Sequence, residues 1–216
     1  MSYSHAHQSR LKGLYIINPP LYDPDLLLRQ VEAALQGGAA VMQFRDKHST
    51  AAEKVTLALR LRNLCESYDA RFIINDQVEL AQEVGAHGVH LGQSDTALAQ
   101  ARQVLGTQAI IGISCYNRLE LALEAERQGA DYVAFGRFFP SRTKPDAVGA
   151  DLDLLRGAKQ VLGIPVAAIG GITAQNALPL VQAAADMLAV IDGVFGQERI
   201  DVAARRLSAC FIRGKS

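Results

Sequence analysis

Short apolar runs alternate with amphipathic stretches along almost the whole of this 216-residue sequence. The runs are rich in valine and isoleucine and are mostly continuous, as in strands that are buried on both faces. Eight such runs are present, at residues 14–17, 40–44, 72–74, 88–91, 109–113, 132–135, 166–169 and 187–191. Amphipathic periodicity predicts helices between them, among others at residues 25–36, 51–68, 119–128 and 152–161.

Eight strand–helix units predict an α/β fold, a single parallel (β/α)8 TIM barrel, with a doubly wound open sheet as the alternative. Three predicted helix-to-strand junctions have closely similar sequences, GGAAVMQF, VGAHGVHL and QGADYVAF. No linker rich in proline and serine divides the chain, so residues 1–216 are read as one domain, with residues 1–12 as a loose leader. The glycines expected to end helices in the left-handed conformation are Gly37, Gly85, Gly106, Gly129 and Gly163.

The composition argues against several kinds of partner. Lysine plus arginine equals aspartate plus glutamate at 22 each, so the formal charge is zero and offers no general attraction to nucleic acid or membrane. No apolar run approaches the roughly 20 residues that cross a bilayer. Cys65, Cys115 and Cys210 form no Cys-x-x-Cys motif, which indicates a reduced, cytoplasmic setting. Any anion binding must therefore come from local placement of charges, and a homo-oligomer is an option that the sequence leaves open.

Functional residues of such a barrel gather at the carboxyl ends of its strands. After the second apolar run, alternation along the strand would place Gln43, Arg45 and Lys47 on one side. Two cations and an amide in this arrangement could grip a diphosphate, with arginine making paired hydrogen bonds and lysine acting as a point charge. A solvated charge cluster at the start of a loop is the plainer alternative.

Two carboxylates follow the next two runs. Asp76 and Asp95 lie at adjacent strand ends, where together they could hold Mg2+, which prefers oxygen ligands and keeps several waters. The alternative is that each aspartate is the N-cap of the helix that follows it. His87 and His90 are three residues apart on a strand, so they point to opposite faces and are interpreted as structural or supporting residues.

The remaining strand ends carry features that suit an anionic ligand. Ser114 follows the fifth run, and the long loop 136–145 after the sixth mixes hydroxyls, cations, aromatics and prolines. Such a loop could close over a ligand as a lid, although its two phenylalanines could instead plug the barrel edge. Gly170 and Gly171 precede a predicted helix, where backbone N–H groups can approach a phosphate.

Taken in order, six segments resemble the signature blocks of the thiamine phosphate synthase family: QFRDK, FIINDQVELA, GVHLGQSD, GIS, ADYVAFGRFFPSRTK and PVAAIGGIT. The resemblance extends from Leu14 to about Ile200. It implies a transferase of thiamine biosynthesis, in which Mg2+ assists the coupling of 4-amino-2-methyl-5-(diphosphooxymethyl)pyrimidine to 4-methyl-5-(2-phosphoethyl)thiazole or its carboxylated form. The products would be thiamine phosphate and diphosphate, formed by a dissociative, carbocation-like substitution.

The resemblance also implies a role for individual residues. Asp76 and Asp95 would bind the metal, and Arg45, Lys47, Lys144 and Ser114 would be catalytic. The pyrimidine diphosphate would be bound by Gln43, Phe44, Arg45, Asp46, Lys47, Asn75, Ser114 and Lys144. The thiazole phosphate would be bound by Ser141, Arg142, Thr143, Gly171, Ile191 and Asp192.

Three residues depart from the usual pattern of that family. Tyr116 stands where a histidine is common, Arg137 replaces a proline, and Asp192 replaces a serine beside the thiazole phosphate. A carboxylate next to a phosphate is repelled by about 1 kcal/mol at 4 Å in water, and by several where the effective dielectric is near 20. The alternative functions are a thiazole tautomerase-like isomerase and a non-catalytic phosphate-binding barrel. The complete set of cations and carboxylates favours the synthase over the isomerase, which would not need it.

Overall fold

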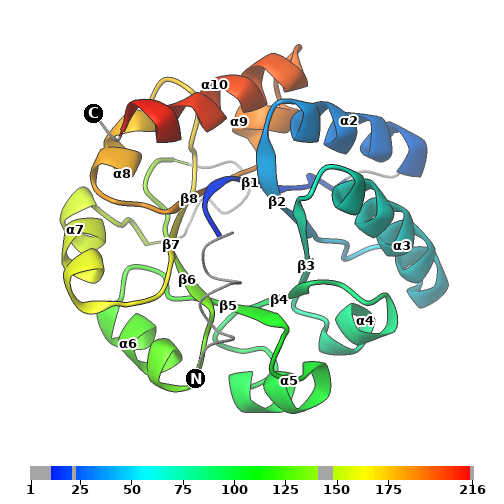
Figure 1. The fold of residues 1–216 in the computed structure, drawn as a ribbon, viewed down its shortest axis with the longest axis horizontal. Coiled ribbons are helices and arrows are strands. Elements are labelled where there is room, and N and C mark those ends of the chain that lie inside the picture. Colours follow the sequence, from blue (N-terminus) through cyan, green and yellow to red (C-terminus); the bar gives the residue numbers. More distant parts are fainter. Residues whose placement is uncertain (1–10, 21–22, 141–147, 215–216) are drawn as a thin grey trace.

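Eight parallel strands close into a barrel in the computed structural model, which describes residues 11–20, 23–140 and 148–214 (Figure 1). Each strand pairs with the next in sequence, and β1 pairs with β8. The predicted (β/α)8 barrel is therefore confirmed, and the doubly wound alternative is wrong. The strands are β1 (Gly13–Ile17), β2 (Ala39–Phe44), β3 (Arg71–Asn75), β4 (Gly88–Leu91), β5 (Ile110–Ser114), β6 (Tyr132–Phe135), β7 (Val166–Ile169) and β8 (Met187–Val190).

The helices form a ring around the strands, with α10 lying between α2 and α8 (Figure 1). Their bounds are α2 (Pro24–Gln36), α3 (Ala51–Ser67), α4 (Val78–Glu83), α5 (Leu98–Leu105), α6 (Leu119–Arg127), α7 (Leu152–Val161), α8 (Leu178–Gln182), α9 (Asp192–Phe195) and α10 (Ile200–Arg213). The predicted strands and the four predicted helices agree with these bounds to within one residue at each end.

Side-chain caps fix where several helices begin. The Asp23 carboxylate accepts hydrogen bonds from the N–H groups of Asp25 and Leu26 at the start of α2. Thr50 and Glu53 form a reciprocal capping box at the start of α3. Because each capped helix directly follows a strand-end loop, these caps also fix the lengths of loops at the carboxyl end of the barrel.

Two separate apolar clusters stabilise the barrel. The larger one lies between the strands and the helices, and the smaller one fills the inside of the barrel. The interior cluster consists of Leu11, Tyr15, Ile17, Val41, Ile73, Ile110, Tyr132, Ala134, Ala167, Met187 and Ala189. Leu11 is only 1% exposed, so the predicted loose leader cannot extend to residue 12. Residues 1–10 lie outside the described residues.

A left-handed turn precedes each even-numbered strand. The residues with positive φ in these turns are Gly38 (94°), Gly85 (63°), Gly129 (90°) and Ala184 (73°). The junction that contains Ala184 is not among the three junctions with similar sequences. The predicted left-handed conformation is wrong for Gly163, and it is wrong for Gly37, whose φ is −78°. Gly37 is required for packing instead, because a Cβ there would lie 2.5 Å from the Cβ of Ala204 on α10.

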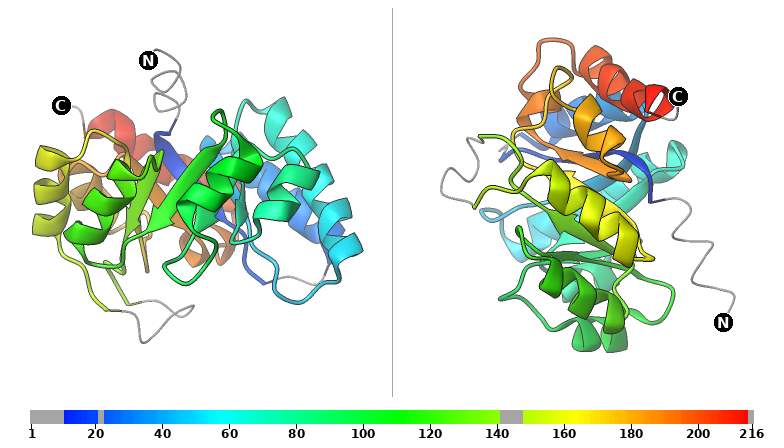
Figure 2. Two further views of the ribbon diagram at one scale, coloured as in Figure 1. Left: turned by 90° about the horizontal axis from the view of Figure 1, so that it is seen from below. Right: turned by 90° about the vertical axis from the view of Figure 1, so that its left-hand side faces the viewer.

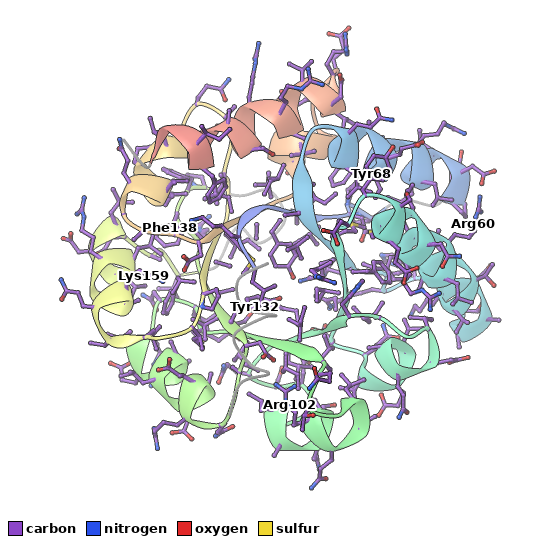
Figure 3. All side chains as sticks on the ribbon, viewed as in Figure 1. Arg60, Tyr68, Arg102, Tyr132, Phe138 and Lys159 are labelled. Atoms are coloured by element: carbon purple, nitrogen blue, oxygen red, sulfur yellow. The ribbon has the colours of Figure 1, made fainter. Side chains whose placement is uncertain are left out.

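A polar side chain immediately before an even-numbered strand ties that strand to its predecessor. The Asp131 carboxylate accepts from Ile111 N–H at 2.8 Å and from the Arg102 guanidinium at 2.7 Å. Asp186 accepts in the same way from Val166 N–H and from the Lys159 ammonium, both at 2.9 Å. Figure 3 labels Arg102 on α5 and Lys159 on α7. Each of these two strand pairs therefore has its own polar clamp at the amino end of the barrel.

Replacing Asp131 by alanine is expected to lower the free energy of unfolding by about 2–4 kcal/mol. The change leaves the buried Ile111 N–H without its acceptor and Arg102 without its carboxylate, and both side chains of the pair are mostly buried, at 23% and 16% exposure. Urea denaturation measures the loss. Asp25→Ala, which breaks an exposed ion pair with Arg60, is the control and should leave the unfolding midpoint near that of the parent. Equal effects of the two variants would contradict the clamp.

All three cysteines are free and buried, in agreement with the prediction that they form no disulfide. Burial raises the pKa of the Cys65 thiol and that of Cys115 to about 12. Among the helices described, none has the length and apolar character needed to cross a membrane.

Candidate active site

Most of the polar residues predicted to act on a ligand end or directly follow strands β2 to β5, and so lie at the same end of the barrel. Figure 2 shows the loops that follow the strands along the lower edge of its left-hand view. The described site residues there come from the ends of β2, β3, β4 and β5 and from the turns after β7 and β8. Parallel strands bring these ends together although the residues are far apart in sequence.

Asp76 and Asp95 meet at this end. Asp76 directly follows β3 in a left-handed conformation, with a φ of 64°, and its N–H donates to the carbonyl of His90 at 2.9 Å. Asp95 accepts a 2.6 Å hydrogen bond from Gly92 N–H. The pKa of Asp76 is raised, mainly by burial and then by hydrogen bonding to and repulsion from Asp95, while Asn75 and the Lys47 charge act in the opposite direction.

The N-cap alternative for these two aspartates is wrong. The residue before α4 is Gln77 and the residue before α5 is Ala97, so neither carboxylate caps a helix. Two half-buried carboxylates held in contact repel each other, and a divalent cation between them would remove that repulsion. No third histidine, cysteine, aspartate or glutamate joins the pair among the residues described. Further oxygen ligands would therefore come from water or from a phosphate-bearing ligand.

The end of β2 is held by a residue that the sequence did not single out. Asn18, which is 4% exposed, accepts from Arg45 N–H at 2.8 Å and donates to the Arg45 carbonyl at 2.9 Å. This side chain extends the β1–β2 pairing by one residue and fixes the backbone from which the Arg45 guanidinium projects. Lys47, two residues further on, is exposed and lies near enough to Asp76 to affect its titration.

Phe44 and Asp46 are oriented differently from their neighbours. Phe44 is 2% exposed and packs in the cluster between strands and helices, so only its backbone can reach a ligand. The Asp46 carboxylate accepts from the N–H groups of His48 at 2.8 Å and Ser49 at 3.1 Å. Burial opposes the negative charge of Asp46, but these bonds and one from the Ser49 side chain outweigh it and lower the pKa. Its carboxylate therefore shapes the loop.

A cavity of about 130 Å³ opens beside this loop, but it is not the mouth of the barrel. Leu27 of α2 and Leu57 of α3 line it together with Arg45–Ser49. Both leucines belong to the outer cluster, so the cavity lies on the helix side of β2. The candidate site is the group of strand ends described above.

Inside the barrel, a chain of hydrogen bonds connects Gln43 to Ser114. Gln43 donates to the Tyr15 hydroxyl, which is bonded to the Tyr132 hydroxyl at 2.9 Å. Tyr132 is bonded to His90 Nδ1 at 2.9 Å, and His90 Nε2 to the Ser114 hydroxyl at 2.9 Å. His90 is therefore a supporting residue, as predicted. His87 lies before β4 and accepts from Phe72 N–H, so the two histidines form no joint site.

The glycines after β7 accommodate the loop that follows β6. Gly170 and Gly171 have φ values of 107° and 62°, and a Cβ on Gly171 would lie 2.3 Å from the carbonyl oxygen of Pro140. Phe139 N–H donates to the Gly170 carbonyl at 3.0 Å. Asn176 fixes the same turn by donating to the Gly171 carbonyl at 3.0 Å. Close packing of two loops thus accounts for the glycine pair.

Four further residues that the sequence singled out lie just after β5, β6 and β8. Ile191 is half-buried, and Asp192 is exposed at the first position of the short helix α9. Tyr116, one of the departures from the family pattern, is 47% exposed and has a φ of 53°. Arg137 pairs through its backbone with Val148 and Ala150, which joins the two described ends of the loop after β6. The predicted residues Ser141, Arg142, Thr143 and Lys144 lie outside the described residues.

Comparison with known proteins places the chain among similar sequences and structures. A family model described as thiamine monophosphate synthase matches residues 14–194. The thiamine-phosphate synthase of Thioalkalivibrio sulfidiphilus is 53% identical over 203 residues, which cover 94% of this chain and 96% of that protein. The thiamine-phosphate synthase of Marinobacter nauticus is 53% identical over 194 residues, covering 89% and 87%. The solved structure of thiamine phosphate pyrophosphorylase from Pyrococcus furiosus is 37% identical, with a TM-score of 0.85, and covers 97% of this chain and 100% of its own.

Proposed function

The chain belongs to the thiamine monophosphate synthase family, whose members are transferases of thiamine biosynthesis. On that premise we propose that it uses Mg2+ to couple the pyrimidine diphosphate to the thiazole phosphate. The observation that carries the proposal is the contact between Asp76 and Asp95 with Lys47 nearby. Two carboxylates suit a magnesium ion, and a cation beside them suits the diphosphate that the ion would neutralise.

The proposed diphosphate site comprises the ends of β2, β3 and β5. Arg45 projects from a backbone that Asn18 holds, and Ser114 is fixed by His90. Asn75 is half-buried at the last position of β3, directly before Asp76. Gln43 and Lys47 complete the described part of the site, with Phe44 and Asp46 contributing backbone groups. Lys144 is proposed from the family resemblance alone.

The thiazole phosphate is proposed to bind across the barrel mouth, at the turns after β7 and β8. Gly171 belongs to the tightly packed turn after β7, and Ile191 and Asp192 join β8 to α9. Ser141, Arg142 and Thr143 would approach from the loop after β6, whose first described part, at Phe138 and Phe139, lies against the turn after β7.

The proposed reaction breaks the bond between the pyrimidine methylene carbon and the diphosphate oxygen, and the electron pair leaves with diphosphate. The resonance-stabilised cation that remains is captured by the lone pair of the thiazole nitrogen, which forms the new C–N bond. Because that nitrogen already has its lone pair, no side chain has to act as a base or nucleophile. Negative charge grows on the leaving group, so Arg45, Lys47 and Lys144 would stabilise the transition state more than the bound substrate.

Bound Mg2+ would supply further neutralisation of the diphosphate charge. The protein itself would have three tasks: to orient the two substrates, to stabilise the departing diphosphate and to exclude water that would capture the cation. We also propose a cytoplasmic setting, which the three free, buried cysteines support.

The direct test mixes the purified protein with both substrates and Mg2+ and follows the release of thiamine phosphate and diphosphate. We expect both products in equal amounts, and no product after chelation of the metal. Correctly folded protein that forms neither product would refute the proposed function.

Asp192→Ser is expected to leave the affinity for the thiazole phosphate unchanged or to raise it by up to about fivefold, as removal of roughly 1 kcal/mol of repulsion would do. Asp192 is exposed at the start of α9, so the substitution removes a charge without opening a cavity. Isothermal titration measures the affinity. Asp153→Ser, which removes an exposed carboxylate from α7, is the control. A marked loss of affinity would show that Asp192 assists binding.

A further inference from the structure

Tyr132 is the central link of the hydrogen-bond chain inside the barrel. It is 0% exposed and cannot touch a ligand, and its hydroxyl lies 2.9 Å both from the Tyr15 hydroxyl and from His90 Nδ1. Figure 3 shows Tyr132 pointing from β6 into the barrel. The chain crosses from β2 through β1, β6 and β4 to β5, so it joins two proposed diphosphate-binding residues that lie on separate strands.

The packing around the Tyr132 ring is specific to this position. The ring lies edge-on to Tyr15 at 6.0 Å and stacks on His90 at 5.5 Å. Gly112 on β5 leaves the space for it, because a Cβ there would lie 2.0 Å from Tyr132 Cζ and 2.4 Å from its hydroxyl oxygen. The glycine of the Gly-Ile-Ser segment therefore admits the hydroxyl that reaches His90.

The donors and acceptors of the chain depend on one another. Burial raises the pKa of both tyrosines, so both keep their protons, and each hydroxyl has one proton to donate. A neutral imidazole has one N–H and one bare nitrogen. If Gln43 donates to Tyr15, the buried Tyr15 proton is paired within this chain only by donating to Tyr132, which then donates to His90 Nδ1. His90 Nε2–H must then donate to Ser114, whose own proton stays available.

The reverse arrangement has the opposite consequence at the ligand. If Ser114 donates to His90, every bond of the chain reverses and ends at the carbonyl oxygen of the Gln43 amide. Ser114 could then only accept a hydrogen bond from a ligand. A diphosphate offers acceptors and no donors, so only the first arrangement suits it. The orientation of the Gln43 amide in the structure, with its nitrogen toward Tyr15, agrees with that arrangement.

We propose that Tyr132 is a positioning residue that acts through His90 to make the Ser114 hydroxyl a donor toward the diphosphate. The proposal deepens the proposed function and rests on it for the identity of the ligand. It also predicts that Gln43 and Ser114 are coupled, because one chain of protons sets the donor state at both ends.

The first experiment uses the ligand-free protein and needs no turnover. Nitrogen-15 NMR of histidine, assigned with a His90→Gln variant, should show a neutral His90 with its proton on Nε2. In Tyr132→Phe, which keeps the ring and removes the hydroxyl, the single tautomer should be lost. A proton on Nδ1 of the parent protein, or a charged imidazolium, would overturn the proposal even if no variant folds.

The second experiment measures binding of inorganic diphosphate with Mg2+. Tyr132→Phe and Ser114→Ala should each weaken binding roughly 10-fold, the loss of one hydrogen bond to a charged group. The double variant should be no weaker than either single variant, since both remove the same bond. Tyr68→Phe, whose hydroxyl is bonded to Glu32 on the helix surface, is the control and should bind like the parent (Figure 3).

These results separate two kinds of failure. Additive losses in the double variant, or unchanged binding in Tyr132→Phe, would overturn the positioning role. Coupled losses and the Nε2–H tautomer, found in a protein that releases no thiamine phosphate, would support Tyr132 while refuting the proposed synthase activity.

Discussion

Asp76→Asn is expected to lower the rate of thiamine phosphate synthesis at least about 100-fold while leaving the metal-free protein as stable as the parent or more so. The substitution keeps the shape of the side chain and removes its charge. Asparagine also tolerates the left-handed conformation of this residue, whose φ is 64°. Alanine would add the strain of that conformation and confuse the result.

The expected gain in stability follows from the electrostatics of the pair. Burial and Asp95 raise the pKa of Asp76 above its ordinary value of 3.8. A raised pKa means that the folded protein binds this proton more tightly than the unfolded chain does. The stabilisation is therefore present below the ordinary pKa and is lost as the pH rises through the raised one. At neutral pH the charged pair is a cost to the metal-free protein, and asparagine removes it.

Melting temperatures with and without Mg2+ test both parts of this prediction. The metal should stabilise the parent protein, since it binds the folded state, and should have much less effect on the variant. Asp69→Asn is a matched control, because Asp69 also has a positive φ, 52°, but precedes β3 at the other end of the barrel. Equal stabilisation of Asp76→Asn and the parent by Mg2+ would refute the assignment of Asp76 to the metal.

Most of the fold could be predicted because its signals are local. Apolar runs rich in β-branched residues predict the strands, and a glycine or a capping residue marks many of the helix ends. The failures have distant causes. Leu11 resembles part of a polar leader until the closed barrel offers it an interior to fill. Gly37 is a glycine because Ala204 packs against it, a contact with a helix at the far end of the sequence.

The site divides in a similar way. Strand alternation and the position after each strand were enough to select Gln43, Asp76 and Ser114. Tyr15 and Tyr132 were missed because an aromatic residue in a buried strand is ordinary, and their hydroxyls meet across 117 residues of sequence. Asn18 was missed because its partner, the backbone of Arg45, becomes its neighbour only when β1 pairs with β2. Sequence patterns thus indicate the candidate ligand-binding groups better than the groups that hold them in place.

Arg45→Ala is expected to lower kcat/KM for the pyrimidine diphosphate by about 100- to 1000-fold with little change in thermal stability. Asn18 holds the backbone of Arg45 on both sides. Among the residues that the structure describes, the guanidinium of Arg45 has no hydrogen-bond or ion-pair partner. Removing it therefore breaks no contact of the described fold, whereas a diphosphate would lose its paired hydrogen bonds.

Arg45→Lys should recover part of the loss, because lysine restores the charge but not the planar pair of donors. Arg60→Ala is the control: Arg60 lies on the outer face of α3, paired with Asp25, and its removal changes the net charge equally (Figure 3). Steady-state rates at varied pyrimidine diphosphate compare the variants. Equal losses in Arg45→Ala and Arg60→Ala would indicate a general effect of charge. Full activity in Arg45→Ala would remove Arg45 from the diphosphate site and leave Asn18 with a structural role alone.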